Sequence, residues 1–213
     1  MFRLLLASSI GLLTCSASVA QTFWQQSTGP FNGQVSCVAA DSSGNLFAGA
    51  TVGVYRSSDN GTTWSQVGLS NSQLWTLAVA PNGYIFAGTG NVNRAGVYRS
   101  TDDGRTWSLV AMPNSYVYAL ATGPSGEIFA GGAGVSRSTD GGLNWTTLNL
   151  SVAVQSLAIT PSGAIFAGTW SGLYRSTDNG ATWALVGLQN QKVTSLIVSR
   201  SGTIFASDGN VFR

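Results

Sequence analysis

One eight-residue pattern, Ser-x-Asp-x-Gly-x-x-Trp, occurs four times in the chain and constrains its fold more than any other feature. The copies begin at Ser57, Ser100, Ser138 and Ser176, each directly after a short segment of strand-forming residues. A chain that reverses between two strands needs a residue that tolerates positive φ, and the glycine supplies it. The aspartate carboxylate accepts hydrogen bonds from backbone N–H groups of the turn. Each copy is therefore expected to be a β-hairpin turn, covered by its tryptophan.

The four copies resemble the Asp-box, or BNR repeat, of sialidase-like, sortilin-like and photosystem-assembly-factor-like β-propellers. The resemblance implies that each box is a structural hairpin on the outer part of a blade, away from any active site. The implied structural residues are Ser57, Asp59, Gly61, Trp64, Ser100, Asp102, Gly104, Trp107, Ser138, Asp140, Gly142, Trp145, Ser176, Asp178, Gly180 and Trp183.

The box belongs to a longer repeat of about 38 to 43 residues, a period that indicates propeller blades. Each unit opens with an apolar segment, turns at a glycine, and continues with a second strand such as Ile-Phe-Ala-Gly. A third strand leads into the box, and a fourth follows it. Four short antiparallel strands per unit are typical of a blade. The expected units are roughly 35–69, 74–112, 117–149, 154–188 and 193–213, the last completed by 21–26.

The two ends of the sequence complement each other. The sequence ends in a third strand at Val211-Phe212-Arg213, and Thr22-Phe23-Trp24 aligns with a fourth strand. Pairing them would close a ring and remove two sheet edges. We therefore expect residues 21–213 to form one all-β domain, a β-propeller of four-stranded antiparallel blades, with five blades closed by the N-terminal outer strand. The alternative is a fragment of a larger propeller, since Asp-box propellers often have more blades.

Residues 1–20 have the form of a secretory signal peptide, with a positive start, an apolar run from Leu4 to Leu13, and a small-residue cleavage site at Ser18-Val19-Ala20. We expect export to the periplasm or the extracellular space after cleavage near Ala20. Stable membrane insertion is not expected, because the apolar run is too short to span a bilayer. Cleavage leaves Cys37, which is expected to be a small buried thiol.

The charge pattern and the missing histidine exclude several functions. Charged residues make up 8% of the chain and form no basic patch, so nucleic-acid binding is not expected. The absence of histidine excludes a Ser-His or Cys-His catalytic pair and a His-ligated metal, and no cofactor is expected. One arginine recurs in every unit and is expected to pack along the blade or to pair with a carboxylate. These arginines are Arg56, Arg99, Arg137, Arg175 and Arg213.

Propellers usually bind ligands on the face built by the loops from fourth to first strand and from second to third strand. Non-repeating aromatic or polar residues there are the candidates, because the repeat itself does not require them. They are Trp75, Asn91, Asn93, Arg94, Tyr116, Tyr118, Trp170 and Lys192. Exposed aromatic rings on a polar rim suit stacking on sugars or on peptide side chains. Alternatively, Trp75 and Tyr118 plug a narrow central channel.

The favoured function is a non-catalytic propeller that binds a protein or glycan partner or scaffolds an assembly. A sialidase-like glycoside hydrolase is the alternative, and such chemistry generally needs two carboxylates beside the scissile bond. Outside the four box positions the carboxylates are Asp41, Asp103, Glu127 and Asp208, of which only Asp208 falls on the candidate face. The Arg-Ile-Pro motif, arginine triad and Tyr/Glu pair of true sialidases are not recognisable here. A propeller fragment without an independent role is the third possibility.

Overall fold

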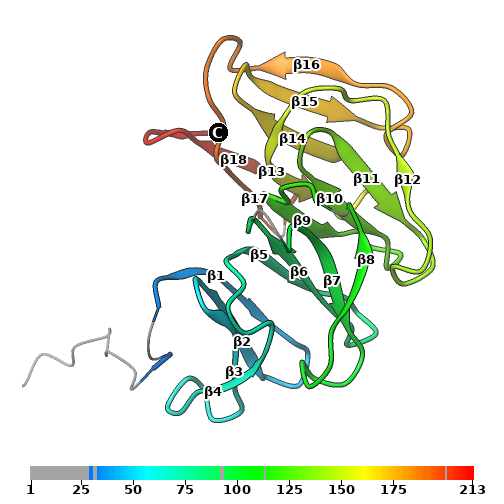
Figure 1. Cartoon of the computed structure of the whole chain (residues 1–213). Helices are drawn as coiled ribbons and strands as arrows, with labels where there is room; N and C mark the ends of the chain where they lie inside the picture. Colours follow the sequence, from blue (N-terminus) through cyan, green and yellow to red (C-terminus); the bar gives the residue numbers. More distant parts are fainter. Residues whose placement is uncertain (1–28, 31–32, 92–93, 113, 200) are drawn as a thin grey trace, which may run out of the picture.

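The computed structural model describes residues 29–30, 33–91, 94–112, 114–199 and 201–213 (Figure 1). Within these ranges the chain contains nineteen β-strands and no helix, and the strands form five antiparallel sheets arranged along an arc. The all-β propeller fold expected from the repeats is thus confirmed. No helix in the described ranges has the length and hydropathy needed to cross a bilayer.

Each of the first four blades has four strands in sequence order, running from the centre outwards. Blade 1 contains β1 (Val35–Ala40), β2 (Leu46–Ala50), β3 (Gly53–Ser57) and β4 (Ser65–Gly68). Blade 2 contains β5 (Leu74–Val79), β6 (Ile85–Thr89), β7 (Gly96–Ser100) and β8 (Ser108–Ala111). Blade 3 contains β9 (Ala119–Thr122), β10 (Ile128–Gly131), β11 (Val135–Ser138) and β12 (Thr146–Thr147). Blade 4 contains β13 (Val154–Ile159), β14 (Ile165–Thr169), β15 (Leu173–Ser176) and β16 (Ala184–Gly187).

Blade 5 has three strands among the described residues. They are β17 (Ser195–Val198), β18 (Ile204–Ser207) and β19 (Val211–Phe212). The strand expected to complete this blade, residues 21–26, and the expected signal peptide, residues 1–20, both lie outside the described residues. Closure of the ring by residues 21–26 therefore stays a prediction.

Strand boundaries differ from the sequence prediction by one or two residues. Fourth strands begin one residue after the box tryptophan, as Ser65 does after Trp64. The first strand of blade 5 begins at Ser195 rather than at Val193, and the Val193 N–H donates to Thr169 O of blade 4 at 2.8 Å. The start of this unit is thus bonded to the blade before it.

The apolar core lies between blades. Phe47, Leu74 and Ile85 share one cluster across blades 1 and 2, with Trp107 packed against it. The central strands β1, β5, β9, β13 and β17 pack against one another in chain order. Cys37 and Ala39 face blade 2. The side chain of Val38, between them in the strand, points to the opposite side of blade 1 and is 71% exposed. Blade 5 likewise leaves Ile197 64% exposed, so both end blades present apolar side chains to solvent.

Candidate ligand-binding face

The polar atoms of each box bond within their own hairpin. In blade 4, Ser176 Oγ donates to Asp178 Oδ1 at 2.8 Å and accepts the Gly180 N–H at 2.8 Å. Asp178 also accepts the Thr182 N–H at 2.9 Å and the Thr182 hydroxyl at 2.5 Å. Trp183 Nε1 donates to Gly180 O at 3.1 Å. The serine and tryptophan bonds recur in the other three boxes, with Asn144 replacing the threonine in blade 3, and support the structural role that the resemblance implies.

These hydrogen bonds stabilise the charged form of the box carboxylates. The bond from the Thr182 hydroxyl, followed by that from its N–H, lowers the pKa of Asp178 from 3.8 to about 2. In blade 3, where Asn144 stands in place of threonine, its N–H and side-chain amide lower the pKa of Asp140 to about 2 as well. A carboxyl with so low a pKa is ionised at neutral pH and is a poor general acid.

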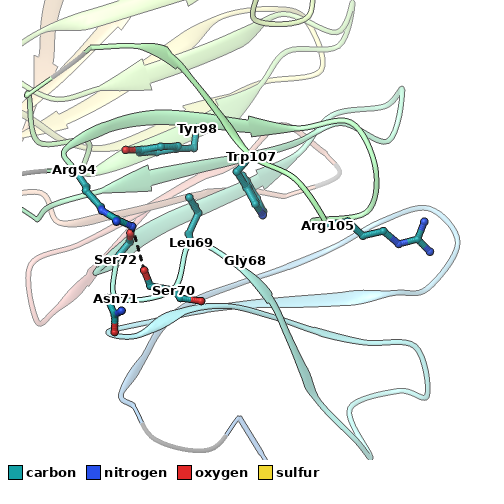
Figure 2. A pocket seen from close by; sticks show the side chains of 9 residues that line it. All are labelled: Gly68, Leu69, Ser70, Asn71, Ser72, Arg94, Tyr98, Arg105 and Trp107. Carbon is teal, nitrogen blue, oxygen red and sulfur yellow. Dashed lines mark hydrogen bonds between the residues drawn. The ribbon is translucent and has the colours of Figure 1, made fainter.

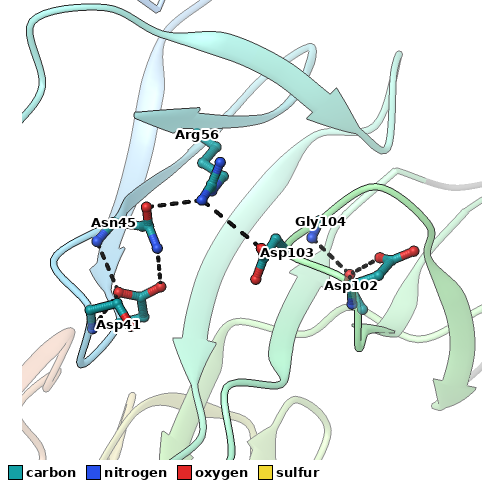
Figure 3. A network of polar contacts seen from close by, with 8 residues as sticks. Asp41, Asn45, Arg56, Asp102, Asp103 and Gly104 are labelled. Atoms are coloured by element: carbon teal, nitrogen blue, oxygen red, sulfur yellow. Dashed lines mark hydrogen bonds and ion pairs between the residues drawn. The ribbon is translucent and has the colours of Figure 1, made fainter. Parts of the chain in front are cut away.

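Asp41, Asp103 and Glu127 are not box aspartates, and all three belong to polar networks. These networks lie on the side of the propeller that carries the turns between first and second strands. Arg56 Nη2 donates to Asn45 Oδ1 at 2.9 Å and lies 4.0 Å from Asp103 Oδ2, as Figure 3 shows. Asn45 in turn donates to Asp41. Arg137 pairs with Glu127 at 3.3 Å. The expectation that the repeated arginines pack or pair is confirmed for Arg56, Arg99, Arg137 and Arg175, since the last three also lie over aromatic rings of their own blades, and it stays a prediction for Arg213.

The opposite face is built from paired loops with an unusual backbone. In blade 4 the loop after β16 has positive φ at Leu188 and Asn190, and the Asn190 N–H donates to Ser171 O at 3.0 Å. This bond ties the loop to the second-to-third-strand loop of the same blade. Blades 1 and 2 repeat the arrangement with Leu69, Asn71, Met112 and Asn114. A signal for it exists in the sequence as Leu-x-Asn or Met-x-Asn after the fourth strand, and sequence reasoning missed it.

Three of the predicted site residues form one aromatic cluster. Trp75 stacks on Tyr118 with ring centroids 4.8 Å apart and 9° between the planes. Tyr116 lies 5.3 Å from Trp75 and is 42% exposed. Gly90 covers the Trp75 indole so closely that a Cβ on this glycine would overlap three ring atoms. Trp75 thus packs against both Gly90 and Tyr118, and Tyr116 offers the exposed ring.

Two further predicted residues meet on blade 4. Lys192 Nζ lies 3.9 Å from the centroid of the Trp170 ring, close enough for a cation–π contact. Trp170 is 57% exposed at the tip of a loop that is held by the Thr169 hydroxyl, which donates to Gly172 O at 2.9 Å. The pair thus presents an aromatic surface and a positive charge on a loop that is held by a hydrogen bond to its own backbone.

Arg94 and Asn91 are placed between blades instead. Arg94 Nη1 donates to Ser70 O at 3.3 Å (Figure 2). Asn91 Nδ2 donates to Asn71 O at 3.3 Å, so both residues tie blade 2 to the loop of blade 1. A groove of about 530 Å³ beside them is lined by Gly68, Leu69, Ser70, Asn71, Ser72, Arg94, Tyr98, Arg105 and Trp107. Asn93 lies outside the described residues. The structure thus gives Arg94 a bridging contact rather than a place in the aromatic cluster.

Comparisons with known proteins agree with this architecture. The model of the BNR/Asp-box repeat matches residues 98–109 and 174–185. The chain is therefore a β-propeller that carries BNR/Asp-box repeats. A comparison with curated protein sequences gave no significant match.

Solved structures similar to this chain include enzymes and a sensor domain. The extracellular domain of a hybrid two component system from B. thetaiotaomicron superposes with a TM-score of 0.72 at 18% identity, over 88% of this chain and 28% of that one. A GH74 enzyme of Niastella koreensis gives 0.69 at 21% identity, over 82% and 33%. Virginiamycin B lyase from Staphylococcus aureus gives 0.66 at 14%, over 82% and 62%. The chain spans less than two thirds of each of these structures, and the likeness shows the fold alone.

Proposed function

We propose that this chain is an exported, non-catalytic propeller that binds a glycan or protein partner through the loop face carrying Tyr116 and Trp170. The observation that carries the proposal is the exposure of these two rings, 42% and 57%, on the face opposite the carboxylate networks. Both rings stand on positions that the repeat does not use. A role in the blade therefore does not account for them.

The energetics of an exposed tryptophan support a binding role. A tryptophan buries about 150–250 Å² when it is fully covered. Trp170 leaves more than half of its surface exposed to water. A partner that covers the ring would therefore bury apolar surface that folding alone does not bury. Lys192 beside the ring adds a hydrogen-bond donor and a positive charge, which suits a hydroxyl-rich or anionic ligand. Tryptophan and tyrosine are also the residues that most often dominate binding energy in protein interfaces.

The proposal that the chain is exported rests on the signal-peptide-like sequence of residues 1–20, and an exported chain would meet an extracellular or periplasmic partner. The similar sensor structure is itself described as an extracellular domain. A protein partner would make the chain a scaffold or receptor, whereas a glycan partner would make it a carbohydrate-binding module. The same face serves either role, because sugar rings and aromatic side chains both stack on exposed indole and phenol rings.

The purified chain, probed on a glycan array and in protein pull-downs, tests this proposal. We expect Trp170→Ala and Tyr116→Ala each to weaken the binding that is detected at least tenfold, about 1.4 kcal/mol. Leu143→Ala is the matched control, because Leu143 is 66% exposed but belongs to the box turn of blade 3. Equal loss in the control variant, or full binding by both aromatic variants, would rule out this face as the binding site. Absence of any retained glycan or protein would rule out the function.

A glycoside hydrolase is the second candidate, because Asp208 lies on the same face and two similar structures are GH74 enzymes. The Asp208 carboxylate accepts the Asn210 N–H at 3.0 Å. Asp41 and Glu127 lie in the turns on the other side of the blades, so this face offers no second carboxylate among its described residues. We expect no hydrolysis of fluorogenic sialosides or of xyloglucan. Turnover that disappeared in Asp208→Asn would establish the enzyme instead.

A further inference from the structure

The groove between blades 1 and 2 contains a buried hydroxyl group without a hydrogen bond. Ser72, in the loop after β4, is 0% exposed, and its Oγ has no hydrogen-bond partner among the described residues. Ser72 is one of the residues that line the groove. An unpaired buried hydroxyl is unfavourable, because folding takes it away from water and supplies no bond in return. A ligand in the groove can supply that bond.

The corresponding serine of blade 2 has a different environment. The Ser115 N–H donates to Met112 O at 3.1 Å, just as the Ser72 N–H donates to Leu69 O at 3.0 Å, so the two serines occupy the same place in their loops. Ser115 is only half-buried, and water therefore reaches it. The unpaired hydroxyl at Ser72 is thus a feature of the groove between blades 1 and 2 and not a property of the repeat.

An arginine with spare donors lies at the same end of the groove. Figure 2 shows Arg94 beside Ser70 and Ser72, and Arg94 Nη1 donates to Ser70 O at 3.3 Å. That bond is longer than the usual N–H···O distance of about 2.7–3.2 Å, and it occupies one of the five N–H groups of the guanidinium. Arg94 is exposed and forms no ion pair with any described residue. Its positive charge is therefore available to an anion.

The described residues that line the groove include no carboxylate, and the second cation points elsewhere. Figure 2 shows Arg105 at the far end of the groove, directed away from Arg94. Trp107 is covered by Gly68, on which a Cβ would lie 2.4 Å from the indole Nε1. Tyr98 of β7 lies towards the Arg94 end, which thus offers one positive charge, hydroxyl groups and a ring surface. The groove, of about 530 Å³, falls within the range of about 300–1,000 Å³ that small-molecule sites occupy.

We propose that the Arg94 end of this groove binds a hexuronic acid, a sugar that carries one carboxylate. The carboxylate forms two parallel hydrogen bonds with the planar guanidinium of Arg94, in place of the long bond to Ser70 O. The guanidinium moves off Ser70, and a ring hydroxyl of the sugar then hydrogen-bonds with Ser72 Oγ. The sugar ring lies against Tyr98. A phosphate monoester fits less well, because it brings a second negative charge for which the described lining holds no second inward-facing cation, and a fatty acid lacks the hydroxyl groups.

Isothermal titration calorimetry of the full chain with D-glucuronate tests this site. D-glucose, which lacks the carboxylate, and acetate, which lacks the sugar ring, should each bind more weakly than D-glucuronate by about tenfold or more. Arg94→Ala should lower the affinity for D-glucuronate by about tenfold or more, and Arg94→Lys should also lower it, because an ammonium group does not form the two parallel bonds. Equal binding of D-glucose or acetate, no binding of D-glucuronate, or full affinity in Arg94→Ala would overturn the proposal.

Ser72→Ala separates binding from folding. Because the hydroxyl has no described partner in the free protein, its removal should leave the thermal unfolding midpoint unchanged or raised, while it weakens D-glucuronate binding about 2–10-fold. Ser115→Ala is the matched control and should keep full affinity. Neither Tyr116 nor Trp170 lines the groove, so Tyr116→Ala and Trp170→Ala should also keep it, and the site is tested independently of the proposed function. Loss of affinity in Trp170→Ala or Ser115→Ala, or full affinity in Ser72→Ala, would count against the site.

Discussion

Replacing Gly142 with alanine tests how tightly a box hairpin packs on the preceding blade. Gly142 has a φ of +83°, and a Cβ built on it would lie 2.6 Å from Cε1 and 3.1 Å from Cζ of Phe86. The Phe86 side chain is fully buried, so its ring cannot swing into solvent to make room. The substitution therefore combines backbone strain with overpacking of the interface between blades 2 and 3.

A second glycine separates these two effects. Gly83 has the same φ of +83°, but no heavy atom lies within 4 Å of the Cβ that alanine would add. The left-handed conformation costs an alanine about 1–2 kcal/mol, which is the whole loss expected for Gly83→Ala. Overpacking adds about 1–3 kcal/mol, so Gly142→Ala should lose about 2–5 kcal/mol.

Urea unfolding followed by far-UV circular dichroism measures the two losses. We expect Gly142→Ala to be less stable than Gly83→Ala by about 1–3 kcal/mol, and Phe86→Leu in the Gly142→Ala background to return part of that difference. Equal losses in the two glycine variants would refute the reasoning, because the φ angles are the same and only the neighbouring blade differs.

Two further outcomes follow from the ionisable groups. The box aspartates have pKa values lowered from 3.8 to about 2, so the stabilisation they give is present above 3.8 and is lost as pH falls towards about 2. Tryptophan fluorescence during acid titration should show this loss, and Asp140→Asn should make it shallower; a chain as stable near pH 2 as at neutrality contradicts it. Burial raises the pKa of the Cys37 thiol to about 12, so iodoacetamide should label this cysteine only after unfolding. Rapid labelling of the folded chain at mildly alkaline pH would show that the thiol is accessible.

Most of the fold could be predicted from the repeat, because the hydrogen bonds of each box join residues that are close in sequence. The box glycines Gly61, Gly104, Gly142 and Gly180 all have φ between +83° and +86°, as a strand-reversing turn requires. The serine whose Oγ accepts each glycine N–H lies four residues before it, so spacing alone predicts those bonds. Blade order follows from the same periodicity.

The candidate site depended on contacts between loops, which the sequence does not show. Trp75 was predicted to lie on the ligand face, and the structure adds that its ring stacks on Tyr118 and lies close to Gly90. Arg94 was also predicted as a ligand residue, and the structure adds that its guanidinium bonds to Ser70 O of the neighbouring blade. Each of these contact partners is 15 to 43 positions away in sequence, and no sequence pattern indicates the contact. Trp170 and Lys192 were both predicted, and the structure adds that they form a pair.

The packing of the last three boxes on the preceding blades was also not predicted from the sequence. Aligned repeats reveal what the units share, but Phe86 and Trp145 belong to different units. Only the structure shows that the strand Ile-Phe-Ala-Gly of one blade meets the box of the next.

Fluorine NMR of the chain labelled with 5-fluorotryptophan tests most directly the central claim, that boxes join blades while the opposite loop face binds the partner. The seven tryptophans give seven resonances, assigned by substitution and followed while a glycan or protein retained in the binding screen is added. We expect the Trp170 resonance to shift and those of Trp107, Trp145 and Trp183 to stay in place. Shifts confined to the box tryptophans, with Trp170 unchanged, would contradict the account.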